Sequence, residues 1–243
     1  MKRFFQNPMA IILIIIMAYY SLDSGILDDP GAWLWSKVLI IPGILIGLTV
    51  HEFAHAFVAY KLGDNTPKYQ KRVTLNPIRH VDPIGLIALF FIGFGWGKPV
   101  EVNSLNFKNT RRDNFLTDIA GIVTNIIIAF IFTGVIKVLL EYNMSMFATE
   151  TGYTILYILI YVVQINLVLA IFNLLPVPPL DGFGIVTEIF DLRRYSWYYK
   201  LYNFGFPILM VLIILGITDR VLFPALNFMM NFMFGIFNMP FTF

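Results

Sequence analysis

The sequence contains no cysteine and few charged residues. Cysteine is absent from all 243 positions, which excludes disulfides, thiolate metal ligands and cysteine nucleophiles, so a metal ion would need His, Asp, Glu or Asn ligands. Charged residues make up 13% of the chain, whereas a soluble domain carries about 25%. The net charge of +2 and the lack of a basic stripe with interleaved aromatic residues argue against a nucleic-acid partner. The remaining composition, 58% hydrophobic and arranged in long runs, indicates a protein that lies in a lipid bilayer.

Long apolar runs divide the chain into candidate membrane helices. We interpret residues 1–22 as a retained first helix, because no small-residue cleavage site follows the apolar stretch. Residues 84–97 are too short for a span and contain glycines near their end, so we expect a re-entrant segment there. The sequence predicts an all-α polytopic membrane protein with about six transmembrane helices, a short re-entrant segment and a small β-hairpin or edge strand. The expected helices are residues 1–22, about 38–62, about 115–140, about 153–175, about 201–218 and 221–239.

Basic residues gather on one side of these predicted helices. Lys2 and Arg3 precede the first helix, and Arg193, Arg194 and Lys200 follow the fourth. The loop after the second helix adds Lys61, Lys68, Lys71, Arg72 and Arg79. The positive-inside rule places these segments in the cytoplasm.

Neither repeats nor an appended soluble domain are visible in the sequence. We therefore expect one membrane-embedded domain over residues 1–243, with a catalytic core at about 38–200, an extra N-terminal helix at 1–22 and C-terminal helices at 201–243. Such a compact chain is typical of a prokaryotic plasma membrane protein.

The motif HEFAH, residues 51–55, lies inside the second predicted helix. Residues four apart share one face of a helix, so His51 and His55 can present ring nitrogens to one metal ion. Glu52 is rotated by about 100° from His51, where a general base can take a proton from zinc-bound water, whose pKa zinc lowers to about 7. Polar side chains in an apolar run are costly in a bilayer, which favours a zinc peptidase site over two buried structural histidines.

A catalytic zinc ion needs a third protein ligand. His80 offers a nitrogen, but it lies in a basic loop, where a surface or loop-bracing role is equally expected. Asp181 follows a helix end broken by prolines at 176–179, which leave backbone groups unpaired, and this is tolerated at membrane depth only around a cavity or against protein. Asp181 is therefore a helix N-cap, a zinc ligand or both, and Glu188 is a weaker candidate.

Two motifs together resemble the site-2 protease family of intramembrane zinc metalloproteases. That family pairs HExxH with a later Asn-x-x-Pro-x-x-x-Leu-Asp-Gly element, which NLLPVPPLDG at 173–182 matches. The segments TLNPIRHVDPIG, GWGKPVEVNSLNF and IAGIVTN are similar to the compact prokaryotic branch without PDZ or CBS domains. The likeness covers about residues 42–184. Ile122 and Phe183 depart from the family pattern, which has proline and glycine there, but neither removes a ligand.

The resemblance implies a zinc metalloendopeptidase that cleaves peptide bonds in or near transmembrane segments, as in regulated intramembrane proteolysis. By position, His51, His55 and Asp181 would bind one Zn²⁺ ion, and Glu52 would be the catalytic base. The active site would lie toward the cytoplasmic side, and the partners would be the lipid bilayer and a transmembrane protein substrate.

The resemblance also implies substrate-binding residues. Asn173 would contact the substrate or the oxyanion, although a hydrogen bond to a helix-end carbonyl is an equal alternative. Residues 98–103 resemble the edge strand of the family, where Val100 and Val102 would hold an extended substrate by β-augmentation.

Two other functions fit parts of the pattern. A non-proteolytic membrane protein of the same fold would bind transmembrane clients without cutting them, but it would not need Glu52. A metal transporter would need ionisable residues along a path through several helices, and the other predicted helices are nearly free of them.

Overall fold

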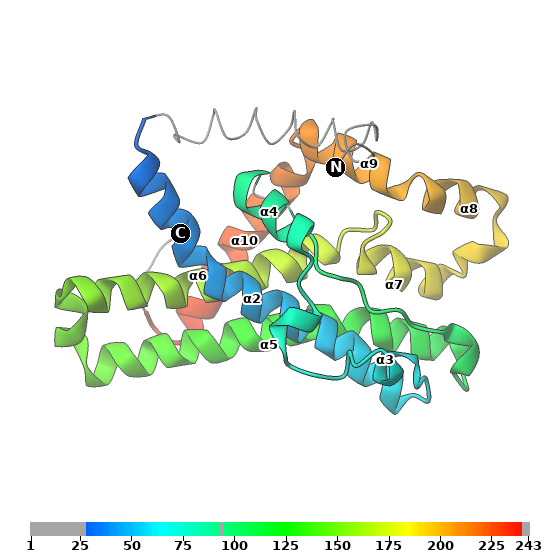
Figure 1. Cartoon of the computed structure of the whole chain (residues 1–243), viewed down its shortest axis with the longest axis horizontal. Coiled ribbons are helices and arrows are strands. Elements are labelled where there is room, and N and C mark those ends of the chain that lie inside the picture. The colour runs from blue at the N-terminus through cyan, green and yellow to red at the C-terminus, as the bar shows by residue number, and fades with distance from the viewer. Residues whose placement is uncertain (1–27, 93–94, 240–243) are drawn as a thin grey trace.

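The computed structural model describes residues 28–92 and 95–239, and this part of the chain is mostly helical (Figure 1). The predicted helix at 1–22 lies outside the described residues. Short helical turns connect the longer elements: α3 (Thr66–Tyr69) and the 3-10 turns Pro77–Arg79, Ser104–Asn106, Met144–Ala148 and Leu192–Arg194.

Three long apolar helices form the centre of the fold. They are α2 (Pro30–Lys61), α5 (Thr110–Tyr142) and α6 (Glu150–Asn173). Each is long and apolar enough to cross a membrane, and each contacts the other two. Figure 1 shows α5 and α6 side by side, with α2 crossing them. These helices cover the predicted span at about 115–140 and all but the last one or two residues of those at about 38–62 and 153–175.

Polar side chains set the beginnings of these three helices. The Asp29 carboxylate accepts a hydrogen bond from the amide of Ala32 (2.9 Å), and Pro30 occupies the first helical position. The side chains of Asn109 and Thr149 cap α5 and α6 in the same way. Because these caps lie outside the apolar runs, each helix begins earlier than the hydrophobic pattern predicts.

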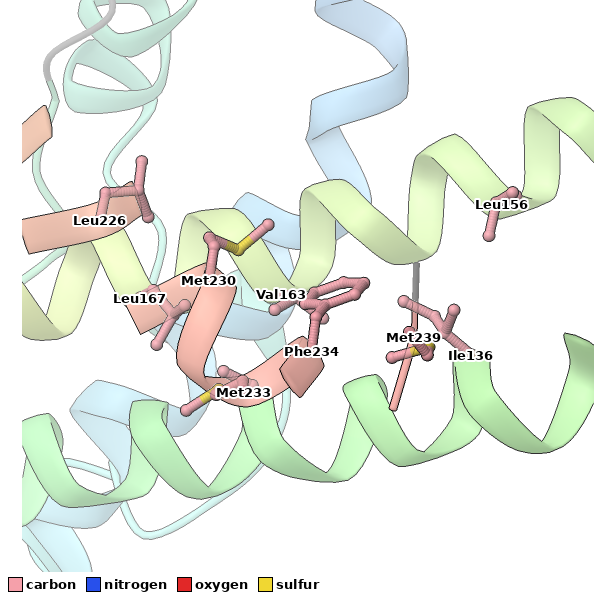
Figure 2. Packing of buried hydrophobic residues seen from close by; sticks show 10 residues of the cluster. Ile136, Leu156, Val163, Leu167, Leu226, Met230, Met233, Phe234 and Met239 are labelled. Carbon is pink, nitrogen blue, oxygen red and sulfur yellow. The ribbon is translucent and has the colours of Figure 1, made fainter. Parts of the chain in front are cut away.

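Apolar side chains fill the space among α5, α6 and α10 (Ile217–Ile236). Figure 2 shows Met230, Met233 and Phe234 of α10 beside Val163 and Leu167 of α6. Burying side chains of this size stabilises a soluble fold by about 1.5–3 kcal/mol each, but lipid is as apolar as the core, so close packing holds the helix here.

The C-terminal part differs from the prediction. The expected span at 201–218 is divided into α8 (Ser196–Asn203) and α9 (Gly205–Ile214), which are bent by 59°. At Gly205 the backbone lies so close to the proline loop that an added Cβ would be 2.5 Å from the Cβ of Pro178. Residues 28–92 and 95–239 thus contain three candidate spans, or four if α8 and α9 make one, and the expected six are not confirmed.

The expected re-entrant segment at 84–97 begins with the short helix α4 (Pro83–Ile92). Val81 and Gly97, on either side of it, form an isolated antiparallel bridge, so the two ends of the segment lie together. The expected edge strand at 98–103 does not form, and in the described part of the chain this bridge is the only β pairing.

Two carboxylates accept hydrogen bonds from backbone amides that a β-ladder at 98–103 would pair with a neighbouring strand. The amide of Val100 donates to Glu52 Oε2 (3.0 Å), and the amide of Asn103 donates to Asp64 Oδ2 (2.8 Å). Side chains from the end of α2 and from the loop after it therefore bind this segment where a partner strand was expected.

Asp64 is fully buried, and it connects the loop after α2 to the end of the segment at 98–103. Its Oδ1 accepts hydrogen bonds from the amide and hydroxyl of Thr66 and from the side chain of Asn106. Burial raises the pKa of Asp64, but the hydrogen bonds from Thr66, Asn103 and Asn106 lower it by more, so the pKa lies below its ordinary value. The resulting stabilisation is present above the unfolded-state pKa of about 3.9 and is lost as the pH falls through the folded-state pKa.

We predict that Asp64→Asn destabilises the protein by about 1–3 kcal/mol at pH 7, because the new amide group faces the amide of Asn103 and leaves it unpaired. Thermal unfolding of the purified protein in detergent measures the effect. Glu101→Gln is the control, since Glu101 is exposed and Gln keeps an acceptor for Gln70. Equal unfolding temperatures for the two variants would contradict the role of Asp64.

Candidate metal centre

Three polar side chains converge between α2 and α7 (Asp181–Phe190). The Nε2 atoms of His51 and His55 are 3.0 Å apart, and Oδ2 of Asp181 lies 3.1 Å from the first and 3.3 Å from the second. A tetrahedral zinc ion with bonds of about 2.0–2.1 Å separates its nitrogen and oxygen ligand atoms by about 3.3 Å. The three atoms therefore have nearly the spacing of a zinc ligand set.

Hydrogen bonds to α5 fix the tautomers of both histidines. Nδ1 of His55 lies 2.7 Å from the carbonyl oxygen of Thr117, which can only accept, so this nitrogen carries the proton. Nδ1 of His51 lies 2.6 Å from Oδ1 of Asn125. The amide nitrogen of Asn125 donates to Gly47 and Asn166, which identifies Oδ1 as the acceptor. In the neutral rings, both Nε2 atoms are therefore left with lone pairs.

The lone pairs of the two Nε2 atoms face a third acceptor, the carboxylate of Asp181. Oδ2 of Asp181 is buried and has no hydrogen-bond donor. Three acceptors that face one another repel unless a cation lies among them, and zinc favours two imidazoles and a carboxylate. The residues present fit a zinc ion, with His51, His55 and Asp181 offering one ligand atom each.

The proline loop before α7 brings Asp181 to α2. α6 ends at Asn173, the chain turns through residues 174–180, and Asp181 is the first residue of α7. A Cβ at Gly182 would lie 2.3 Å from the carbonyl oxygen of Leu174, so the tight return of the chain requires glycine at this position. α7 then packs against α5.

Asn125 is a part of the site that sequence reasoning missed. It is fully buried and links His51 of α2 to Asn166 of α6, whose own amide donates to the carbonyl of Val162 (2.8 Å). The available signal was an asparagine inside the apolar run at 115–140, since a polar side chain at membrane depth implies a partner.

Gly121 allows α5 to approach the histidines. A Cβ at this position would lie 2.6 Å from Cε1 of His51 and 2.6 Å from Nε2 of His55. Any side chain here would displace both imidazoles, so the glycine is required by packing rather than by backbone conformation.

Glu52 lies next to the cluster without belonging to it. Its side chain is 13% exposed, and its Oε2 accepts the amide of Val100 and lies 3.7 Å from the guanidinium of Arg72. The three polar residues of HEFAH thus have different neighbours: His51 and His55 belong to the acceptor cluster, whereas Glu52 faces the segment at 97–100.

The competing ligand candidates are engaged elsewhere. His80 is fully buried, and its Nε2 donates to the carbonyl of Thr74 (2.7 Å). Burial, with a smaller contribution from Arg72, lowers the pKa of His80, so the ring is neutral and braces its loop. Glu188 accepts from Asn114 (3.0 Å) and pairs with Arg193 (2.7 Å).

Two of the expected substrate-binding residues, Asn173 and Val100, make contacts within the protein. The amide nitrogen of Asn173 donates to the carbonyl of Leu169 (2.9 Å), one turn earlier in α6. Val100 contacts Glu52 through its amide, and Val102 lies half-buried two residues further along. Of the two departures from the family pattern, Ile122 packs with Ala170 and Ile185.

The second departure, Phe183, is buried and stacks on Tyr198 of α8, with ring centroids 5.7 Å apart. The phenylalanine side chain, which stands where the family has glycine, therefore packs in a contact between α7 and α8.

Comparison with known proteins agrees with this chemistry. Residues 142–216 match the profile of peptidase family M50. YwhC of Bacillus subtilis (strain 168), named as a zinc metalloprotease, is 41% identical over 184 residues, which are 76% of this chain and 84% of YwhC. Rip2 of Mycolicibacterium smegmatis, named likewise, is 27% identical over 236 residues, 93% of this chain and 87% of Rip2. Rip2 of Mycobacterium tuberculosis (strain Erdman) is 30% identical over 162 residues, 64% and 59% of the two chains. No solved structure matches the chain significantly.

We predict that Asn125→Leu weakens metal binding about 10- to 100-fold, because it removes the acceptor that orients His51 while keeping a similar volume. Zinc retention against a graded chelator measures the effect. Thr133→Val is the matched control, since Thr133 is a buried polar residue of the same helix that bonds only to the carbonyl of Ala129. If the two variants lost zinc at the same chelator concentrations, Asn125 would have no role in metal binding.

Proposed function

The chain belongs to peptidase family M50, the site-2 type of zinc metalloprotease, and we propose that it hydrolyses peptide bonds in or near transmembrane segments of membrane-protein substrates. One observation carries this proposal: two histidines of an apolar helix that is long enough to cross a membrane converge with Asp181 of α7 on one possible metal position, beside the carboxylate of Glu52. A soluble peptidase has no need to build its centre on such a helix.

The chemical roles divide among four residues. His51, His55 and Asp181 hold the zinc ion, and α5 orients both imidazoles through hydrogen bonds to their Nδ1 atoms. A zinc ion held by these residues would polarise the scissile carbonyl and would supply a nucleophile at neutral pH. Glu52 is the general base: its carboxylate takes the proton from the attacking water and passes it to the leaving amine.

The substrate binds in an extended form along residues 98–103. A helical peptide bond is shielded by its own hydrogen bonds, so the substrate helix has to unwind before attack. Residues 98–103 have no partner strand in the described structure, and the carbonyl of Val100 and the backbone groups of Val102 would pair with a substrate strand. Asn173 contributes an amide donor to the oxyanion if it leaves the carbonyl of Leu169.

The centre opens toward the cytoplasm of a prokaryotic cell. The loop after α2 carries the basic residues that the positive-inside rule assigns to this side, and HEFAH lies within the last three turns of α2. α4 enters and leaves the membrane on this side, which the bridge between Val81 and Gly97 supports. The chain lies in the plasma membrane of that cell.

We predict that Glu52→Gln abolishes cleavage, by a factor of at least about 10², and leaves the zinc content unchanged, because glutamine cannot accept the proton but is not needed to hold the metal. The purified protein is incubated with a set of single-span membrane peptides, and fragments are identified by mass spectrometry. Glu101→Gln controls for loss of an exposed carboxylate. Cleavage by Glu52→Gln at the wild-type rate would refute the role of Glu52. Wild-type protein that holds zinc and binds these peptides without cutting them would indicate the non-proteolytic alternative.

We predict that Asp181→Asn releases zinc at chelator concentrations at least about tenfold lower than wild type, because it replaces an anionic ligand with a neutral one. Metal analysis of the dialysed protein measures this independently of any substrate. Asp191→Asn is the control, since Asp191 follows the same helix and pairs with Arg194. If Asp181→Asn retained zinc as wild type does, the third ligand would have to be another residue.

A further inference from the structure

Arg72 is a buried arginine on the cytoplasmic side of α2. Only 4% of its surface is exposed, whereas the neighbouring Arg79 and Lys71 are exposed. A buried guanidinium is costly unless carboxylates or carbonyls surround it, so its position requires specific partners.

The partners of Arg72 come from three separate segments. Its guanidinium donates to the backbone carbonyls of Arg79 and Lys98. One of its terminal nitrogens, Nη2, lies 3.7 Å from Oε2 of Glu52. The fork of an arginine can reach all three at once, whereas the single ammonium of a lysine cannot. Arg72 therefore connects the basic loop, the segment at 97–100 and the HEFAH helix.

The same carboxylate oxygen is held from a second direction. Two residues after Lys98, the amide of Val100 donates to Oε2 of Glu52 (3.0 Å). The amide of Lys98 itself donates to the carbonyl of His80 (2.7 Å). A Cβ at Gly97 would lie 3.4 Å from Oε1 of Glu52, so the backbone of this segment also packs on the other oxygen. The orientation of Glu52 is thus set by a segment whose place is set by Arg72.

We propose that Arg72 is a positioning residue for Glu52: it clamps the Lys98–Val100 segment so that the Val100 amide and the guanidinium together hold Oε2 and aim the carboxylate at the metal centre. This inference rests on the proposed function, in which Glu52 is the base. Arg72 touches neither the substrate nor the three metal-ligating residues in this arrangement, so its removal acts on the rate of the chemical step and not on metal binding.

The first test compares Arg72→Gln, Arg72→Lys and Arg79→Gln in the peptide-cleavage assay, with zinc measured in every sample. In Arg72→Gln we expect kcat to fall about 10- to 100-fold, KM to change by less than about threefold and zinc to stay bound. Arg72→Lys recovers part of kcat, because it restores the charge and one donor. Arg79→Gln is the matched control: only its backbone carbonyl contacts Arg72, and the exposed side chain is free to change.

The second test does not require turnover. Hydrogen–deuterium exchange of the peptide that spans residues 97–103 reports how firmly the segment is held. We expect faster exchange there in Arg72→Gln and in Glu52→Ala, and wild-type exchange in Arg79→Gln. Because a buried arginine also supports folding, exchange in the core of α5 and α6 is followed in parallel, and it should stay at the wild-type level.

The outcomes separate the two hypotheses. An active wild type with Arg72→Gln equal to Arg79→Gln in kcat and in exchange would overturn the role of Arg72 and leave the peptidase intact. A defect in KM alone, or a loss of zinc that parallels the loss of rate, would also overturn it, because Arg72 would then serve the substrate or the metal. A wild type that cleaves no membrane peptide would overturn the proposed function, while the exchange data would still decide whether Arg72 clamps the segment.

Discussion

The rest of the structure depends on the two hydrogen bonds that the histidines donate to α5. Each Nδ1 has an acceptor on that helix, the carbonyl of Thr117 for His55 and the side chain of Asn125 for His51. Both Nε2 atoms are thereby left as lone-pair donors directed at Asp181. A polar centre in apolar surroundings is tolerated only when every group in it has a partner, so α5 has to approach closely, and Gly121 permits that approach.

The packing of the other helices follows from this contact. α2 carries the histidines, α6 completes the network through Asn166, and α7 brings Asp181 once the proline loop has turned the chain. α10 packs against α5 and α6 through apolar side chains (Figure 2). The polar network therefore fixes the relative positions of α2, α5 and α6, and apolar packing adds the C-terminal helix to a bundle that the site already defines.

Sequence patterns predicted the parts of the fold that depend on local properties. The three long helices follow from hydrophobicity. The pairing of HEFAH with Asp181 follows from the proline-broken helix end and from the resemblance to the site-2 protease family, although their assignment as ligands stays a prediction. The predictions that were wrong concern structures that depend on contacts between distant segments. The span at 201–218 is broken where Gly205 meets Pro178, and the strand at 98–103 is replaced by hydrogen bonds to Glu52 and Asp64. Periodicity carries no information on either contact.

The metal ligands and the base are supported by different parts of the chain. The ligands depend on helices packed at membrane depth, whereas Glu52 depends on an extended segment that carboxylates and a guanidinium hold at three points: Arg72 binds the carbonyl of Lys98, Glu52 the amide of Val100 and Asp64 the amide of Asn103. A substrate that binds along this segment, as proposed, would lie beside the residues that orient the base, and this links recognition of an unwound peptide to the geometry of its cleavage.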